Sequence, residues 1–133
     1  MKFLGLLTFL LGFSAFANNP QIRTCRITGG EFHAVRALND EFGFCTYESA
    51  MMDSISLLLV TTSSQKTLAV QAFESGLQCS QSQGSVVRGE DLENKKFDLC
   101  VFSDESLVEL GTLQAGPNAS ANTGLMKALQ MRF

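Results

Sequence analysis

Hydrophobic and polar positions in the first half of the chain predict a helix, a hairpin and a second helix. Asn19-Pro20 is typical of a helix start, with Asn as N-cap, and Gly29-Gly30 is typical of a helix end. The runs Glu31 to Leu38 and Phe42 to Tyr47 predict two strands around a polar turn. Apolar spacing from Ser49 to Leu59 then predicts a helix, although its C-terminal part is rich in strand-forming residues.

The same order of elements recurs in the second half. A longer helix with a broad apolar stripe is expected after Ser63-Ser64, which would cap it. The runs Ser85 to Arg88 and Phe97 to Phe102 predict a second hairpin around a charged loop. Ser103 is expected to cap a final helix, because the acidic residues behind it suit a helix N-terminus.

Together these elements predict an α+β fold of two tandem α-β-β-α units, in which antiparallel hairpins pack with helices. The first unit covers residues 18–62, the second 63–116, and residues 117–133 form a tail that is flexible or a short amphipathic helix. Each hairpin has a second apolar face, and a lone hairpin is only marginally stable in water. We therefore expect the two hairpins to join in a four-stranded antiparallel sheet or to pack face to face.

An internal repeat supports this division. Cys25–Gly30 and Cys79–Gly84 both read Cys, four residues, Gly, and Phe42–Tyr47 matches Phe97–Phe102 around the second cysteine of each copy. The cysteines lie 20 residues apart in the first copy and 21 in the second. Three apolar residues follow at the same offsets in each copy: Met52, Ile55 and Leu58, against Leu107, Leu110 and Leu113.

The first 17 residues have the pattern of a secretory signal peptide, with Met1-Lys2, a short apolar run and small residues up to Ala17. We expect cleavage after Ala17 and a periplasmic or secreted protein. No later stretch is apolar and long enough for a transmembrane helix in the mature chain. Loss of Lys2 with the leader changes the formal net charge from -3 to -4, and this acidic balance argues against a nucleic-acid partner.

The four cysteines all lie behind the expected cleavage site, where an oxidising compartment favours disulfides. Four cysteines allow three pairings. Equivalent copies favour one of them, Cys25 with Cys45 and Cys79 with Cys100. Metal or redox chemistry is disfavoured, because the chain has no Cys-x-x-Cys pair and a single histidine.

Four short motifs of the first copy follow one another in a fixed order: Asn19-Pro20, Cys25, Gly29-Gly30 and Gly43-Phe44-Cys45-Thr46-Tyr47. In this order they resemble a family of small exported bacterial domains of unknown function known as hemolysin-like. The resemblance covers about residues 18–50 and, more faintly, 79–103, and it implies a bacterial envelope location. The chain departs from the family after Cys45, where the expected Pro-Asp-Gly-Ser turn and Trp are missing.

Candidate chemistry is sparse. His33, the one histidine, is expected at an ordinary strand position, and no Gly-x-Ser-x-Gly motif frames a nucleophilic serine. Acidic residues cluster in the two hairpin loops without the spacing of a calcium site: Asp40 and Glu41 in the first, Glu90, Asp91 and Glu93 in the second. We therefore expect no catalytic residue, no metal and no cofactor.

These observations favour a non-catalytic binding or interaction module, for example an inhibitor of a hydrolase, because rigid loops lose little entropy on binding. One alternative is an envelope-associated structural protein held by Leu125, Leu129 and Phe133 of the tail. A more remote alternative is a small hydrolase that uses His33. The target and the oligomeric state stay open.

Overall fold

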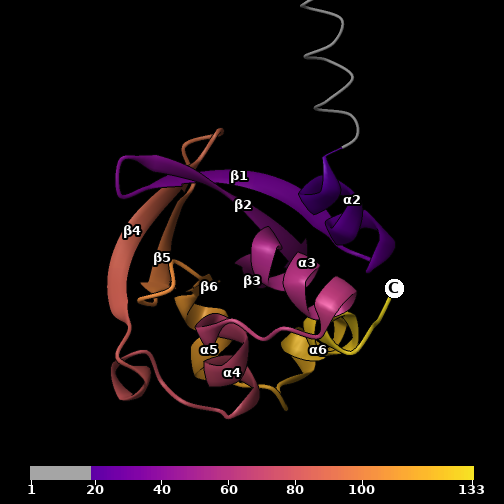
Figure 1. Ribbon diagram of the computed structural model, residues 1–133. Coiled ribbons are helices and arrows are strands. Elements are labelled where there is room, and N and C mark those ends of the chain that lie inside the picture. Colours follow the sequence, from indigo (N-terminus) through magenta and orange to yellow (C-terminus); the bar gives the residue numbers. More distant parts are fainter. Residues whose placement is uncertain (1–18) are drawn as a thin grey trace, which may run out of the picture.

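Six antiparallel strands close into a barrel in the computed structural model, which describes residues 19–133. They are β1 (Glu31–Ala37), β2 (Asp40–Tyr47), β3 (Ala50–Asp53), β4 (Ser85–Asp91), β5 (Lys96–Val101) and β6 (Leu107–Glu109). Their order around the barrel is β1-β2-β3-β6-β5-β4 (Figure 1). Each half of the chain thus supplies three consecutive strands to one closed sheet.

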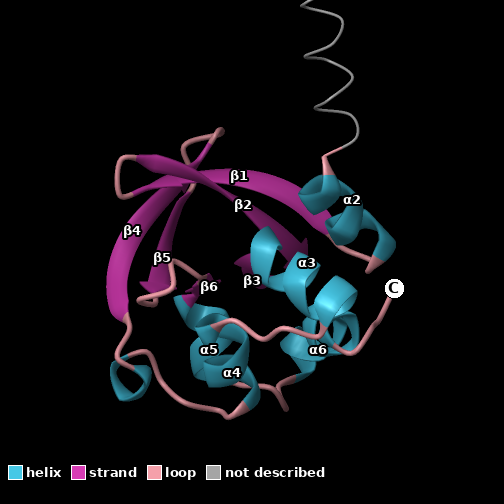
Figure 2. Cartoon of the chain, viewed as in Figure 1, coloured by secondary structure: helices cyan, strands magenta, loops and turns pink. Residues whose placement is uncertain are grey.

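The helices of the described region gather on one side of the barrel (Figure 2). They are α2 (Pro20–Ile27), α3 (Ser54–Ser63), α4 (Leu68–Glu74), α5 (Leu110–Ala115) and α6 (Thr123–Leu129), with two short 3₁₀ helices, η1 (Ser80–Ser82) and η2 (Ser120–Asn122). The start of α2 is as predicted, because the Asn19 side chain accepts a hydrogen bond from the Gln21 amide at 2.8 Å and Pro20 follows it.

The strand register relates the two halves by an approximate twofold axis. The β3 and β6 residues that pair with the strand cysteines are Met52 and Val108, so these two are equivalent. In β1 and β4, the residues that pair with the same cysteines are Phe32 and Val86. Arg36 and Glu90 each follow them by four residues, so these two are equivalent as well. Met52 pairs with Val108, and Arg36 with Glu90. Antiparallel pairing of equivalent residues is the arrangement that a twofold axis between two strands produces.

Two hydrophobic cores form because successive strand residues point to opposite faces of the sheet. The barrel interior is filled by six buried residues: Val35, Ala37, Phe44, Met51, Leu99 and Leu107. The second, larger core lies between the opposite face of the strands and the helices, and it contains all four cysteines. The second apolar face expected for each hairpin is therefore real, and the two faces belong to separate cores.

The repeated Cys-x4-Gly motif forms the same turn in both halves. The Gly30 amide donates to the Cys25 carbonyl at 2.8 Å, and the Gly84 amide donates to the Cys79 carbonyl at 2.9 Å. A Cβ at Gly84 would lie within 2.8 Å of the sulfur of Cys79 and still closer to that of Cys100. Gly84, the glycine of the second copy, therefore lets the chain pass directly over the Cys79–Cys100 disulfide.

Gly84→Ala is expected to destabilise the protein by about 2 kcal/mol, because the added methyl group overpacks the disulfide site. Urea unfolding followed by circular dichroism measures the change. Gly76→Ala is the control, since its Cβ would meet nothing closer than 4.0 Å and the cost is limited to the left-handed backbone (φ +68°), about 1 kcal/mol. Equal losses in the two variants would refute the steric explanation.

The predicted pair of α-β-β-α units is wrong, and so are both predicted arrangements of the hairpins. Each half contains a third strand, and the six strands form one closed antiparallel barrel instead of a four-stranded sheet or two stacked hairpins. The first missed strand, β3, lies where a helix from Ser49 to Leu59 was expected. Met51 points into the barrel and Met52 toward the helices, and all four residues of β3 are buried. Pairing on both sides outweighs the helix propensity of methionine here.

The second half differs from expectation in the same way. Residues 107–109, expected inside a helix after Ser103, form β6, and helix α5 begins only at Leu110, with Glu109 as its N-cap. A long helix was expected after Ser63-Ser64 from the apolar stripe there. The helix that forms, α4, is shorter than this stripe and covers only Leu68–Glu74.

The C-terminal segment packs against the first half of the chain. Leu125, Ala128 and Leu129 of α6 are buried, and the Phe133 amide donates to the Thr61 carbonyl at 2.8 Å. Of the three residues considered as an envelope anchor, only Phe133 is exposed. The predicted signal peptide, residues 1–17, lies outside the described residues. Within residues 19–133, no helix has the length and apolar character needed to cross a membrane.

Candidate functional site

Asp53 joins the two halves of the barrel at the point where β3 ends and α3 begins. Its Oδ1 accepts a hydrogen bond from the Ser56 amide at 2.8 Å, as an N-cap does. Its Oδ2 accepts from the Ser56 hydroxyl at 2.7 Å and from the Leu107 amide of β6 at 2.8 Å. One buried carboxylate, only 5% exposed, thus caps a helix of the first half and holds a strand of the second.

A chain of hydroxyl groups continues from Asp53 to the start of α4. The Ser56 hydroxyl, which donates to Asp53, lies 2.6 Å from the hydroxyl of Thr67. Thr67 is the N-cap of α4 and accepts a hydrogen bond from the Val70 amide. Through these contacts Asp53 is linked to the segment that connects the two halves.

Asp104 also contributes to the N-terminal cap of helix α4. Its carboxylate accepts hydrogen bonds from the Leu68 amide at 2.9 Å, the Ser106 amide at 3.1 Å and the Ser106 hydroxyl at 2.5 Å. The Ser106 hydroxyl in turn accepts from the Ala69 amide at 3.0 Å. Side chains of the β5–β6 connection therefore supply acceptors for the first amides of α4, which have no partner within the helix.

Above Asp53 these elements enclose a pocket of about 410 Å³. Its walls combine apolar side chains with polar ones, among them the hydrogen-bonded groups just described. The lining residues are Gln21, Glu41, Phe42, Gly43, Asp53, Ile55, Leu59, Gln65, Lys66, Thr67, Asp104, Glu105, Ser106 and Leu107. Four of these residues are acidic, and none of the four forms a salt bridge within residues 19–133. Lys66 is paired with Glu74 at 2.8 Å. The pocket therefore carries excess negative charge.

Burial raises the pKa of Asp53 from 3.8 to about 6. Its hydrogen bonds from Leu107 and Ser56 act in the opposite direction, and the negative charge of Asp104 raises the pKa further. For Asp104, burial is outweighed by the hydrogen bonds from Leu68 and Ser106, which hold its pKa below the usual range. The two carboxyls therefore titrate in different pH ranges, and Asp53 changes charge near pH 6.

Asp53 is expected to make the protein less stable as the pH rises from about 4 to about 7. The folded state holds the Asp53 proton up to about pH 6, whereas the unfolded chain releases it near pH 3.8, so the stabilisation is complete below pH 3.8 and lost through pH 6. The shift corresponds to about 3 kcal/mol at most. Urea unfolding across this range should show a steeper loss for the wild type than for Asp53→Asn. Parallel curves for the two proteins would contradict the assignment.

The equivalent position in the second half carries Glu109, and the two sites differ. Glu109 also caps its helix, accepting from the Thr112 amide and the Thr112 hydroxyl, both at 2.9 Å. The Met51 amide, equivalent to that of Leu107, donates to the Thr112 hydroxyl at 3.0 Å instead of to the carboxylate. Both caps therefore bind the third strand of the opposite half, but only Asp53 does so directly.

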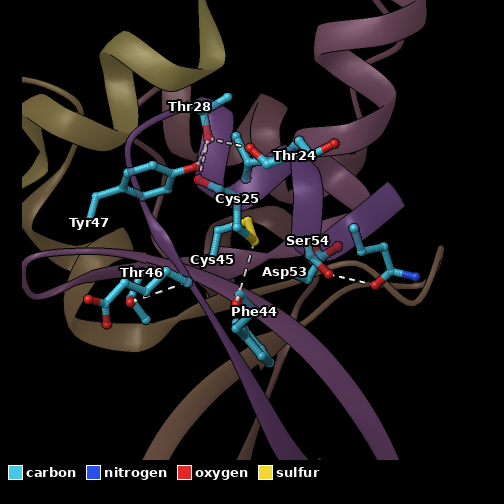
Figure 3. Close-up of a disulfide and its surroundings, with 12 residues drawn as sticks. Thr24, Cys25, Thr28, Phe44, Cys45, Thr46, Tyr47, Asp53 and Ser54 are labelled. Carbon is cyan, nitrogen blue, oxygen red and sulfur yellow. Dashed lines mark hydrogen bonds between the residues drawn. A yellow bond between two sulfur atoms is a disulfide. The ribbon is translucent and has the colours of Figure 1, made fainter. Parts of the chain in front are cut away.

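Both predicted disulfides are present, Cys25–Cys45 and Cys79–Cys100. Figure 3 shows the first of them joining α2 to β2. Beside it, the Tyr47 hydroxyl lies 2.6 Å from the hydroxyl of Thr28, which donates to the Thr24 carbonyl at 2.7 Å. Burial raises the pKa of Tyr47. The disulfides hold helices and turns against the barrel and lie outside the pocket lining.

His33 lies apart from Asp53. In strand register His33 pairs with Phe44, and Phe44 with Asp53, so a buried aromatic ring separates the two titratable groups. Within residues 19–133, His33 forms an ion pair with Glu31 alone, with Nε2 3.5 Å from a carboxylate oxygen. The hollow beside His33 is lined by Asn19 and the β4–β5 loop, with no serine or cysteine from the described part of the chain. The strand register thus does not bring His33 and Asp53 together, and the hydrolase alternative stays a prediction.

The two acidic clusters have different surroundings. Glu41 of the first lines the pocket above Asp53, whereas Asp40 lies beside it on the hairpin tip. In the second cluster, Asp91 accepts hydrogen bonds from the amides of Glu93 and Lys95, both at 2.9 Å, which fixes the β4–β5 loop. Neither cluster gathers with other ligand residues into a metal site within residues 19–133.

Sequence reasoning missed Asp53, Asp104 and the hydroxyls between them. A signal for Asp53 exists, because Met51-Met52-Asp53-x-x-Ser56-Leu57 matches Leu107-Val108-Glu109-x-x-Thr112-Leu113. Equal offsets from Cys45 and Cys100 pair Met52 with Leu107, one residue out of the structural register, and so hide this match. No comparable local signal marks Asp104, whose partners in α4 lie 36 residues away in the chain.

Comparison of the chain with protein-family models, curated proteins and solved structures finds no match. The resemblance of the first copy to the hemolysin-like family stays a prediction.

Proposed function

We propose that the protein is a disulfide-stabilised binding module that takes a cationic side chain of a partner protein, lysine or arginine, in the pocket above Asp53. The observation that carries this proposal is a pocket of about 410 Å³ with four carboxylates and one lysine, which is already paired with Glu74. A cationic ligand would offset the mutual repulsion of these carboxylates. The apolar side chains of Phe42, Ile55 and Leu59 suit the aliphatic stem of such a residue.

The two disulfides support a site of action outside the reducing cytosol, since such bonds persist in oxidising compartments. The predicted signal peptide would deliver the chain there. A module of this kind needs no catalytic group, and inhibition of a hydrolase is one role it could serve, if the bound lysine or arginine belongs to the enzyme. The barrel supports binding because its closed sheet and cross-links keep the pocket walls in place before a ligand arrives.

Binding can be tested with a small probe. N-acetyl-arginine amide is expected to shift the amide resonances of Ser56, Gln65 and Leu107 in a titration followed by NMR. N-acetyl-citrulline amide, which has the same shape without the charge, is expected to leave them unchanged. Below about pH 6 the arginine probe should bind more weakly, because Asp53 becomes neutral.

Glu105→Gln and Glu41→Gln remove charge from the pocket wall without touching the hydrogen bonds of Asp53. Each is expected to weaken binding of the arginine probe several-fold, and Glu93→Gln, outside the pocket, is the matched control. Equal shifts with the arginine and citrulline probes, or no shifts with either, would refute a cation site.

A further inference from the structure

Four charged residues form a row across the outer face of the barrel, one on each of four adjacent strands. In strand register Glu41 of β2 pairs with Arg36 of β1, Arg36 with Glu90 of β4, and Glu90 with Lys96 of β5. Side chains of directly paired residues share one face of the sheet. The signs along the row alternate as negative, positive, negative, positive, and adjacent strands about 4.8 Å apart give it a length of about 14 Å.

The approximate twofold axis passes through the centre of this row and reverses its charges. Arg36 is equivalent to Glu90, and Glu41, which pairs with Arg36, is equivalent to Lys96, which pairs with Glu90. A second copy of the chain, turned over by a half-turn about an axis along the strands, therefore presents the row in reversed order. Arg36 then lies opposite Glu90 of the other copy at the centre of the contact, and Glu41 lies on the same side as Lys96 of the other copy at its margins.

Exposed leucines flank the row at equivalent hairpin tips. Leu38 follows Arg36 by two residues and Leu92 follows Glu90 by two, and they are 57% and 67% exposed. Leu38 has φ +55°, a left-handed conformation that is unfavourable for leucine. The turn thus holds an apolar side chain in solvent at a backbone cost, which a contact at this surface would explain.

The row is available for such a contact. Arg36, Glu41 and Lys96 are exposed, Glu90 is half-buried, and none of the four forms a salt bridge within residues 19–133. The crossing of β1 and β4 lies on the side of the barrel opposite the helices (Figure 2). The barrel wall is convex there, so Arg36 and Glu90 form the centre of the exposed face and Glu41 and Lys96 its margins.

We propose that this face, the charged row with Leu38 and Leu92, is an isologous interface through which two copies of the chain form a weak, salt-sensitive dimer. Charge complementarity selects a second copy as the occupant, because any surface with the reversed row would fit and this chain itself carries one. The interface lies apart from the pocket above Asp53 except for Glu41, which borders both. The proposal is independent of what the pocket binds.

Two double variants test the proposal by charge exchange. Glu41→Lys/Glu90→Lys makes the row wholly positive, and Arg36→Glu/Lys96→Glu makes it wholly negative. By sedimentation equilibrium of the oxidised protein at low salt, each variant alone is expected to be monomeric, and an equal mixture of the two is expected to form a heterodimer. The wild type is expected to dimerise, with a dissociation constant that rises about tenfold or more at high salt.

A third variant separates an interface from cross-strand pairing within one barrel. Reversing all four charges, with Arg36→Glu, Glu41→Lys, Glu90→Lys and Lys96→Glu, keeps the alternation and is expected to restore the homodimer but not to pair with the wild type. A wild type that stays monomeric at every concentration would overturn the proposal. So would a dimer that persists unchanged in either double variant, or a mixture of the two double variants that stays monomeric while both remain folded by circular dichroism.

Discussion

Reduction of both disulfides is expected to bring the protein close to unfolding at room temperature. Each closes a loop of about 20 residues, and in the chain-entropy model such a loop contributes about 3 kcal/mol by restricting the unfolded chain. Together they supply about 6 kcal/mol, against a total stability of about 5–15 kcal/mol for a domain. Urea unfolding with and without a phosphine reductant, followed by far-ultraviolet circular dichroism, measures the loss.

The twofold relation of the halves sharpens this prediction. Because the disulfides occupy equivalent positions in loops of nearly equal length, Cys25→Ala/Cys45→Ala and Cys79→Ala/Cys100→Ala are expected to cost similar amounts, about 3 kcal/mol each. The two pairs share no loop, so the effects should add. A reduced protein that unfolds at the same urea concentration as the oxidised one would show that the barrel does not depend on these links.

Features encoded in short stretches of sequence could be predicted. The hairpin from Glu31 to Tyr47 has alternating apolar residues around a polar turn, and its pairing needs only neighbouring chain. The cysteine pairing followed from the repeat, because equivalent copies must bond alike. The cap at Asn19 likewise depends on residues directly after it.

The barrel itself could not be predicted in this way, since its closure depends on partners distant in the chain. β3 and β6 have four and three residues, too few for an alternation pattern to be recognised. They are strands because each lies between its hairpin and the other half, as the pair Met52–Val108 shows. The residues after Ser49 therefore resemble the start of a helix, because no local pattern reports this long-range contact.

The pocket arises where the two halves differ. Thr46 pairs with Met51 in the first half and Val101 with Leu107 in the second, so the β5–β6 connection is one residue longer than its counterpart. That longer connection carries Asp104, Glu105 and Ser106 over Asp53 and against α4. A sequence repeat points to what the halves share, and for this reason it could not reveal a site built from an insertion.

Asp53→Ala is expected to cost about 3 kcal/mol at pH 5, where the carboxyl is neutral, and less near neutral pH, where removal of a buried charge offsets part of the loss. The substitution removes the α3 cap, about 1 kcal/mol, and leaves the buried Leu107 amide without its acceptor, at about 1–3 kcal/mol, whereas the Ser56 hydroxyl can still donate to Thr67. Because the charge of Asp53 is itself unfavourable above about pH 6, the loss should be larger at pH 5 than at pH 7.

Glu109→Ala is the matched control for this change, since it removes the equivalent cap from α5. Its expected cost is smaller, about 1 kcal/mol, because Thr112 stays in place to accept the Met51 amide and the Glu109 carboxylate is not buried like that of Asp53. Urea unfolding of both variants at pH 5 and pH 7, at one salt concentration, gives the four free energies of unfolding that this comparison needs. If the two variants lose equal stability with the same pH dependence, Asp53 acts only as a helix cap. A larger and pH-dependent loss for Asp53 alone identifies its carboxylate as the group that holds the two halves of the barrel together beneath the pocket.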